Sequence, residues 1–434
     1  MAIIMIQNKQ NLKCGLLGEH LRHSFSPIIH SYLADYSYAL FEKEKEDVKD
    51  FLKSDLYDAI NVTIPYKKTV IPYLDKLSPE AQSIGAVNTI TKDSEGRLCG
   101  NNTDYYGFEY LVKKSKITLK DKNILIIGAG GASTTANAVS KDMGAGKVTV
   151  ISRKSRPNYE EIQQLFHETQ VIINCSPVGM YPKNLISPLS LEKFTACCGV
   201  IDMIYNPAKT KLLLDAEHLA IPCINGLSML TAQAKRACEL FLNEKIDNSE
   251  IDRITDIINK KTRNIVLVGM PGSGKSTVGN IIAEKMSRPF YDTDEEIVKN
   301  TGQVIPKIFE NEGENTFRIY ENRAVCSVGK MSGCVISTGG GVVTREINLE
   351  PLAQNSLIFF IKRDISAIPT DNRPLSQKNS LADMFSKRLP MYKYFCDFEV
   401  GNDSTPEECA EKIISLFNSH AEAAKRQKQD WRSI

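Results

Sequence analysis

Two glycine-rich loops constrain the fold more than any other feature of this chain. One follows the apolar residues 123–127 and reads GAGGAS at 128–133, and the other follows residues 264–268 and reads GMPGSGKS at 269–276. Each loop is followed by a stretch with helical spacing, from Thr134 and from Thr277 respectively, so each is expected to open its own parallel sheet as a strand–loop–helix unit. The loops differ in length and chemistry, which excludes an internal repeat.

Composition and charge exclude several classes of protein. The chain has 434 residues, of which 42 % are hydrophobic and 24 % charged, as in an ordinary globular protein of several domains. Lys and Arg number 54 against 52 Asp and Glu, so there is no charge surplus for nucleic acid or an anionic membrane. We therefore expect small-molecule partners, no nucleic acid and no membrane, and leave the oligomeric state open.

The eleven cysteines are scattered through the chain. They form no C-x-x-C pair and no cluster with the six histidines. Such spacing favours reduced thiols and a cytoplasmic location over a disulfide framework or a zinc site. No apolar run approaches the ~18 residues that span a bilayer.

The first loop has the chemistry of a dinucleotide site. Gly128 permits a tight turn, Gly130 allows close approach of a pyrophosphate, and the helix start supplies N–H donors. The next strand ends in Ser152, Arg153 and Lys154, where a cofactor with a free ribose would favour a carboxylate. The two cations suit a 2′-phosphate, which predicts NADP(H). A structural turn and two solvated surface cations remain the alternatives.

The second loop is a P-loop signature after a strand. Its successive N–H groups form a nest for phosphate oxygens, Lys275 reaches the β- and γ-phosphates, and the Ser276 hydroxyl suits Mg²⁺. The pattern predicts ATP-type chemistry with Mg²⁺ and leaves the acceptor open.

Polar clusters precede the first glycine loop at expected strand ends. They read SFSP at 24–27, NVTIPYK at 61–67, GAVNT at 85–89 and NNTD at 101–104. Because loops carry function and these are rich in hydroxyl and amide groups, they predict a site for a polyhydroxylated substrate. Their single Lys–Asp pair suits proton transfer.

The chain resembles shikimate dehydrogenase over roughly residues 10–250. The resemblance rests on these clusters and GAGGAS, together with NCSPVGM at 174–180, DMIY at 202–205 and the stretch 225–233, which occur in the same order as in that family. The resemblance implies that Lys67 and Asp104 form the catalytic pair. It implies substrate contacts from Ser24, Ser26, Thr63, Asn88, Tyr205 and Gln233. It implies cofactor contacts from Gly128, Gly130, Gly131, Ala132, Ser152, Arg153, Lys154, Met203 and Gly226.

The region from 263 to about 418 resembles shikimate kinase, through the P-loop, DTD at 292–294, the helical motif at 317–321, STGGG at 337–341, RPL at 373–375 and the motif at 388–392. The resemblance implies that Asp294 binds the acceptor and takes its proton, with Lys275 and Arg373 as catalytic cations. The resemblance implies substrate contacts from Arg318, Gly340, Gly341 and Arg388. It implies nucleotide contacts from Gly272, Ser273, Gly274, Lys275, Ser276 and Thr277, and metal contacts from Ser276 and Asp292.

We therefore predict an α/β protein: a two-lobed dehydrogenase with a Rossmann-type NADP lobe, followed by a P-loop three-layer α/β/α kinase domain. The expected parts are a substrate lobe (1–104), the NADP lobe (105–225), returning helices (226–258), a linker (259–262), the kinase domain (263–420) and a polar tail (421–434).

The predicted function is reduction of 3-dehydroshikimate with NADPH, then phosphorylation of shikimate with ATP. Two segments are short compared with the families that they resemble: 154–171 is shorter than is usual in shikimate dehydrogenases, and 373–388 is shorter than is usual in shikimate kinases. One alternative therefore stays open, an active dehydrogenase with a regulatory, catalytically weak kinase domain. A second is a dehydrogenase that uses quinate or NAD.

Overall fold

The computed structural model describes residues 12–21, 24–153, 161–367 and 381–420. Lys154, Arg373 and the expected polar tail after residue 420 lie outside these residues. The chain divides into two compact units. Unit 1 comprises Met1–Pro177, Ser190–Tyr205 and Ile221–Thr255, and unit 2 comprises Val178–Leu189, Asn206–Ala220 and Asp256–Ile434. The finer boundaries given above stay a prediction.

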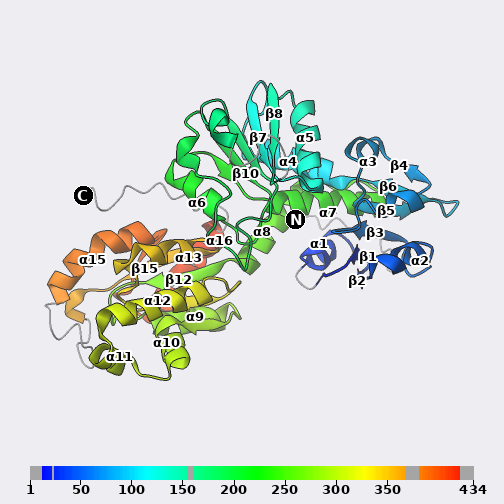
Figure 1. Cartoon of the computed structure of the whole chain (residues 1–434). Coiled ribbons are helices and arrows are strands. Elements are labelled where there is room, and N and C mark those ends of the chain that lie inside the picture. The colour runs from blue at the N-terminus through cyan, green and yellow to red at the C-terminus, as the bar shows by residue number, and fades with distance from the viewer. Residues whose placement is uncertain (1–11, 22–23, 154–160, 368–380, 421–434) are drawn as a thin grey trace. The chain divides into compact units, whose positions relative to one another are not determined.

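Unit 1 begins with a six-stranded mixed sheet (Figure 1). Its order is β2 (Ser37–Glu42), β1 (Lys13–Gly18), β3 (Ala59–Val62), β5 (Thr89–Lys92), β6 (Leu98–Asn101) and β4 (Lys76–Leu77). β1 runs parallel to β2 and β3, whereas β5 is antiparallel to β3 and β6. The accompanying helices are α1 (Ser26–Leu33), α2 (Val48–Leu52) and α3 (Pro79–Ile84).

The second sheet of unit 1 is parallel throughout. Its order is β11 (Cys223–Ile224), β10 (Gly199–Asp202), β9 (Val171–Asn174), β7 (Asn123–Ile127) and β8 (Lys147–Ile151). α5 (Gly131–Asp142) follows β7, and α4 (Thr103–Ser115) packs against α7 (Leu227–Leu242). β7 lies at the switch point between β9 and β8, where ligands bind in open parallel sheets.

The sheet of unit 2 is also parallel, in the order β13 (Phe290–Asp292), β14 (Val335–Ser337), β12 (Asn264–Val268), β15 (Ser356–Lys362) and β16 (Phe398–Gly401). The helices are α8 (Ser249–Thr262), α9 (Lys275–Lys285), α10 (Thr293–Thr301), α11 (Ile305–Asn311), α12 (Gly313–Val328), α13 (Leu349–Ala353), α15 (Leu381–Phe395) and α16 (Pro406–His420). α8 begins in unit 1 and ends in unit 2.

Helices cover both faces of this third sheet. Alternate side chains of a strand point to opposite faces. Ile265 and Leu267 of β12 pack in a cluster with residues of α9 and α16, whereas Val266 and Val268 pack with residues of α12 and α15. The predicted α/β class, with a P-loop unit of three layers, is thereby confirmed.

Unit 2 also includes a helix from earlier in the chain, α6 (Lys211–His218). Within this unit Lys211 Nζ lies 2.6 Å from Glu350 Oε1, and Asn184 Nδ2 donates a hydrogen bond of 2.5 Å to Gln354 Oε1. All eleven cysteines of the chain are free thiols.

Two local expectations need correction. The helix after the first loop was expected from Thr134, but α5 begins at Gly131, with Gly130 as its N-cap. The helix after the second loop was expected from Thr277 and begins at Lys275, with Gly274 as N-cap. α8 runs through residues 259–262, so these residues are helical, and their role as a linker stays a prediction.

We predict that the two units have separate cores. Ile126 and Leu267 are fully buried, in clusters that belong to unit 1 and unit 2 respectively. Ile126→Ala should lower the free energy of unfolding of unit 1 by about 2–5 kcal/mol, and Leu267→Ala that of unit 2 by a similar amount. Denaturant titration with a signal specific to each unit measures both.

Leu56→Ala is the matched control for this pair. Leu56 is 56 % exposed, so its truncation should change stability by less than about 0.5 kcal/mol. Equal destabilisation of both units by either core variant would contradict separate cores.

Candidate functional sites

The first glycine loop has room for a phosphate group. Gly128 has φ +117°, in the region that favours glycine, and a Cβ there would approach the Cys175 carbonyl oxygen to 3.0 Å. A Cβ on Gly130 or Gly131 would meet no atom within 4 Å. Open space therefore lies over the N-terminus of α5, whose first N–H groups, including that of Ala132, have no partner within the helix. The loop fits a pyrophosphate.

The remaining predicted cofactor residues of unit 1 lie after other strands of the same sheet. Ser152 and the exposed Arg153 follow β8, and Lys154 lies outside the described residues. Met203 follows β10 and packs against Gly226, where a Cβ would come within 2.1 Å of the Met203 carbonyl oxygen. Close packing therefore accounts for Gly226 being glycine, and its contact with a cofactor stays a prediction.

A cavity of about 650 Å³ in unit 1 brings together residues from five separate motifs. Its lining contains every predicted substrate contact of this unit together with the predicted catalytic lysine: Ser24, Ser26, Thr63, Lys67, Asn88, Tyr205 and Gln233. The cavity is therefore lined by hydroxyl, amide and ammonium groups, which suits a ligand with several hydroxyl groups.

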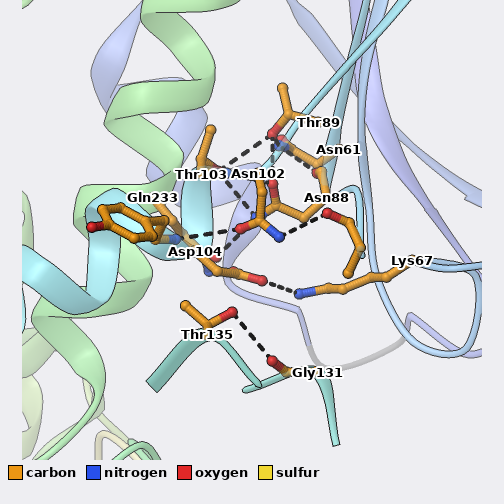
Figure 2. Close-up of polar contacts among 12 residues, drawn as sticks. Asn61, Lys67, Asn88, Thr89, Asn102, Thr103, Asp104, Gly131, Thr135 and Gln233 are labelled. Carbon is orange, nitrogen blue, oxygen red and sulfur yellow. Dashed lines mark hydrogen bonds and ion pairs between the residues drawn. The ribbon is translucent and has the colours of Figure 1, made fainter. Parts of the chain in front are cut away.

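Lys67 forms an ion pair with Asp104 (Figure 2). Lys67 Nζ lies 2.6 Å from Asp104 Oδ2, and the two side chains are 25 % and 9 % exposed. Asn102 is the N-cap of α4 and accepts a hydrogen bond from the Tyr105 N–H, which fixes Asp104 in the first turn of that helix. The pair can hold and release a proton at the cavity wall.

Asn88 is held by several hydrogen bonds at the same cavity. Its Oδ1 accepts from the Thr103 main-chain N–H at 2.7 Å, and its Nδ2 donates to Thr103 Oγ1 at 3.1 Å and to Gln233 Oε1 at 3.5 Å (Figure 2). The amide orientation is thereby set before any ligand arrives.

The second loop wraps around the Lys275 ammonium. Lys275 Nζ donates to the carbonyl oxygens of Gly269 and Met270 at 3.0 and 2.9 Å. Gly274 has φ +93°, and a Cβ there would lie 2.5 Å from Asn402 Nδ2. Asn402 Nδ2 donates to the Ser273 carbonyl oxygen at 2.8 Å, so the loop between Gly272 and Ser276 is held from the residue that follows β16.

The residues predicted for Mg²⁺ converge. Ser276 Oγ donates to Asp292 Oδ2 at 2.8 Å and lies 3.2 Å from Ser337 Oγ. Hydroxyl and carboxylate oxygens are hard ligands of the kind that Mg²⁺ prefers. The donor set fits the ion, with Thr277 next along α9.

A second group of predicted residues surrounds the glycine triplet after β14. A Cβ on Gly339 would lie 2.7 Å from Asp294 Oδ1, and one on Gly341 would overlap the Arg318 guanidinium. Arg388 Nη1 donates to the Gly340 carbonyl oxygen at 3.2 Å. Asp294, two arginines and the glycine backbone therefore form one site, while Arg373 lies outside the described residues.

Arg318 is buried in that site and paired. Its Nη1 contacts both carboxylate oxygens of Glu321 at 3.0 Å, and its Nη2 lies 3.0 Å from Glu314 Oε1. Although burial opposes the charged form, the Glu321 and Glu314 carboxylates raise the pKa of Arg318. Two carboxylates are thus committed to orienting this cation.

Asp294 has an unusual environment for a carboxylate. Its Oδ1 is buried and has no hydrogen-bond partner among the described residues. Burial and the Asp292 charge raise the pKa of Asp294 from 3.8 to about 6, against the opposing charges of Lys275 and Arg318. Such a group can accept a proton near neutral pH.

Sequence reasoning missed several residues at these sites. Asn61 and Glu321 lie within motifs that were singled out, but their partners are set by tertiary contacts. Tyr392, whose hydroxyl donates to the Gly340 carbonyl oxygen at 2.5 Å, stands in the same motif as Arg388. The role of Asn402 could not be predicted from its sequence neighbours, because its partner in the P-loop, Ser273, lies far away in the sequence.

The fold and the sites together indicate a class of protein, a nucleotide-dependent dehydrogenase joined to a P-loop unit of the kinase type. Protein-family models agree. The model "Shikimate dehydrogenase substrate binding domain" matches residues 16–90, and the model "Shikimate kinase" matches residues 271–418.

Whole relatives place the first part of the chain. A shikimate dehydrogenase (NADP(+)) of Clostridium beijerinckii is 37 % identical over 254 residues, which cover 54 % of this chain and 93 % of the relative. The crystal structure of a chorismate mutase/shikimate 5-dehydrogenase fusion protein from Clostridium acetobutylicum is 35 % identical with a TM-score of 0.55, covering 58 % of this chain and 98 % of that one.

A third relative is the shikimate 5-dehydrogenase of Thermus thermophilus, solved in complex with NADP(H) and shikimate. It is 30 % identical, with a TM-score of 0.51, over 56 % of this chain and 98 % of its own. This chain belongs to the shikimate dehydrogenase family, and a shikimate kinase domain follows in the same polypeptide, as in a bifunctional enzyme.

No helix within the described ranges is both long and apolar enough to cross a bilayer. Nor do those ranges contain a group of three or more His, Cys, Asp or Glu side chains placed to hold a metal ion.

The raised pKa of Asp294 predicts a pH-dependent stability. Between 3.8 and about 6 the folded protein keeps a proton that the unfolded chain has released. The folded state then binds more protons, so the free energy of unfolding of unit 2 falls as pH rises through this window, by roughly 3 kcal/mol. Denaturant titration at several pH values measures the slope.

Asp294→Asn should remove this contribution, whereas Glu295→Gln, at the exposed neighbouring carboxylate, should keep it. A wild-type slope equal to that of Asp294→Asn would show that Asp294 titrates at its ordinary pKa, contrary to the structure.

Proposed function

We propose that this chain reduces 3-dehydroshikimate to shikimate with NADPH and then phosphorylates the 3-hydroxyl of shikimate with ATP and Mg²⁺. The observation that carries the first step is the Lys67–Asp104 ion pair at a cavity lined by hydroxyl and amide groups. The second step is supported by the P-loop, the Asp294 carboxyl and the two arginines around one glycine triplet.

Reduction needs a hydride at the ketone carbon and a proton at its oxygen. The loop at 128–133 and Arg153 would hold NADPH, which would supply the hydride and become NADP⁺. The Lys67 ammonium gives its proton to the developing alkoxide, and the Asp104 carboxylate holds that ammonium in place. Ser24, Ser26 and Gln233 are placed at the cavity wall to bind the carboxylate and hydroxyl groups of the substrate.

The preference for NADPH over NADH is assigned to Arg153. This exposed cation follows β8 where a carboxylate would bind a free ribose, and a guanidinium suits a 2′-phosphate. Relatives named shikimate dehydrogenase (NADP(+)) support the same preference.

Phosphorylation needs a hydroxyl that loses its proton and a phosphoryl group whose charge is balanced. Asp294, ionised above about pH 6, accepts the proton of the shikimate 3-hydroxyl. Arg318 and Arg388 bind the substrate carboxylate, because a guanidinium matches its geometry. Lys275 would balance charge on the β- and γ-phosphates of ATP. Ser276 and Asp292 would hold Mg²⁺, which would stabilise the charge of the transferred group.

The two activities should separate by mutation. Lys67→Ala should lower kcat of the reduction by roughly 10²–10⁴-fold and leave phosphorylation of added shikimate unchanged. Lys275→Ala should do the reverse. Each activity is measured alone, by NADPH absorbance and by ADP release.

Lys68→Ala is the matched control for the redox step, because Lys68 is the adjacent, exposed lysine. It should retain both activities. Loss of both activities in a folded Lys67→Ala or Lys275→Ala protein would refute two independent sites, and a wild type that never forms ADP would favour a regulatory kinase domain.

A further inference from the structure

A partly buried set of hydrogen bonds lies behind one wall of the unit 1 cavity. Asn61 lines the cavity, and its Nδ2 donates to Thr89 Oγ1 at 3.2 Å and to the Asn88 carbonyl oxygen at 3.4 Å (Figure 2). Its Oδ1 accepts from the Tyr38 hydroxyl at 2.7 Å. Both N–H groups of this amide are therefore committed within the protein.

The polarity of these bonds is fixed. The Asn88 main-chain oxygen can only accept, so the nitrogen of the Asn61 amide faces it and the oxygen faces Tyr38. The Tyr38 hydroxyl must then donate to Asn61. Its own oxygen remains able to accept.

Tyr38 itself is held by stacking. Its ring lies 4.1 Å from the ring of His30, at an interplanar angle of 15°. His30 is buried in turn, and its Nδ1 is 2.5 Å from the Tyr36 hydroxyl. Burial raises the pKa of Tyr38 well above its usual range, so the hydroxyl stays protonated and remains a donor.

We propose that Tyr38 is a positioning residue of the dehydrogenase site. It does not line the cavity, yet it connects two of the cavity walls: its ring stacks on His30 of α1, and its hydroxyl bonds to Asn61 on β3, which adjoins Asn88. By fixing these walls relative to each other, Tyr38 keeps the hydrogen-bonding groups of the cavity spaced for a hydroxylated carboxylate ligand. Such preorganisation lowers the entropic cost of binding.

This inference rests on the proposed reduction, and it predicts a specific pattern in the kinetics. Tyr38→Phe keeps the ring and its stacking and removes only the hydroxyl. Its contacts act on binding groups remote from the reacting carbonyl, so KM for 3-dehydroshikimate and Kd for shikimate should rise on the order of tenfold, with kcat changed by less than about twofold.

Tyr57→Phe is the control. Tyr57 is buried in the same lobe and its hydroxyl donates to the Leu52 carbonyl oxygen at 2.7 Å, but it lies outside the cavity lining. The same chemical change there should leave KM and Kd unaltered even if stability falls.

A double-mutant cycle tests whether Tyr38 acts through Asn61. The double variant Tyr38→Phe with Asn61→Ala should raise Kd for shikimate less than the product of the two single effects. Fully multiplicative effects would overturn the coupling, and an unchanged Kd in Tyr38→Phe would overturn the proposal outright.

Calorimetric titration with shikimate, beside steady-state kinetics, separates the two possible failures. A wild type that binds shikimate and reduces 3-dehydroshikimate, with a Tyr38→Phe variant that matches it, refutes the role of Tyr38 alone. A wild type that neither binds nor reduces these compounds refutes the proposed function, and the role of Tyr38 falls with it.

Discussion

Backbone N–H groups at the start of a helix, which the internal hydrogen bonds of the helix cannot reach, are the constraint on which both nucleotide sites depend. In each case a buried strand, β7 or β12, delivers the chain to a glycine loop, and the helix after it begins with donors that no carbonyl within the helix satisfies. Side chains on these glycines would fill the space over Gly130 and collide with Asn402 beside Gly274. The order of the strands in each parallel sheet then places the polar residues that follow neighbouring strands at the same edge of the sheet as the glycine loop.

The two sites use charge in different ways. At the cavity of unit 1 the charges of Lys67 and Asp104 neutralise each other in an ion pair of 2.6 Å, in which the Lys67 side chain is partly exposed and the Asp104 side chain is nearly buried. Around Asp294 the balance is reached by burial, with a carboxyl partly protonated near neutral pH and flanked by Lys275 and Arg318. One pair suits giving a proton to a ketone oxygen, and the other carboxyl suits taking one from a hydroxyl.

Local patterns predicted the strands at 123–127 and 264–268 at their observed bounds, because a buried apolar run before a glycine loop has few other structures open to it. Helix starts were placed late, since the sequence does not show that Gly130 and Gly274 serve as N-caps. The residues expected to contact substrate in unit 1 all line one cavity, and their contact with a substrate stays a prediction. The role of Tyr38 could not be predicted from the sequence. Its strand, β2, shows no clear alternation of buried and exposed residues, and its hydrogen bond to Asn61 reaches across β1, which lies between β2 and β3.

The most direct test of the account is one incubation of the wild-type chain with 3-dehydroshikimate, NADPH and Mg-ATP, followed by mass spectrometry, with each cofactor omitted in turn. The account predicts shikimate 3-phosphate only when both cofactors are present, and shikimate when ATP is left out. Accumulation of shikimate in the complete mixture would contradict the proposed kinase, and no consumption of 3-dehydroshikimate would contradict the account as a whole.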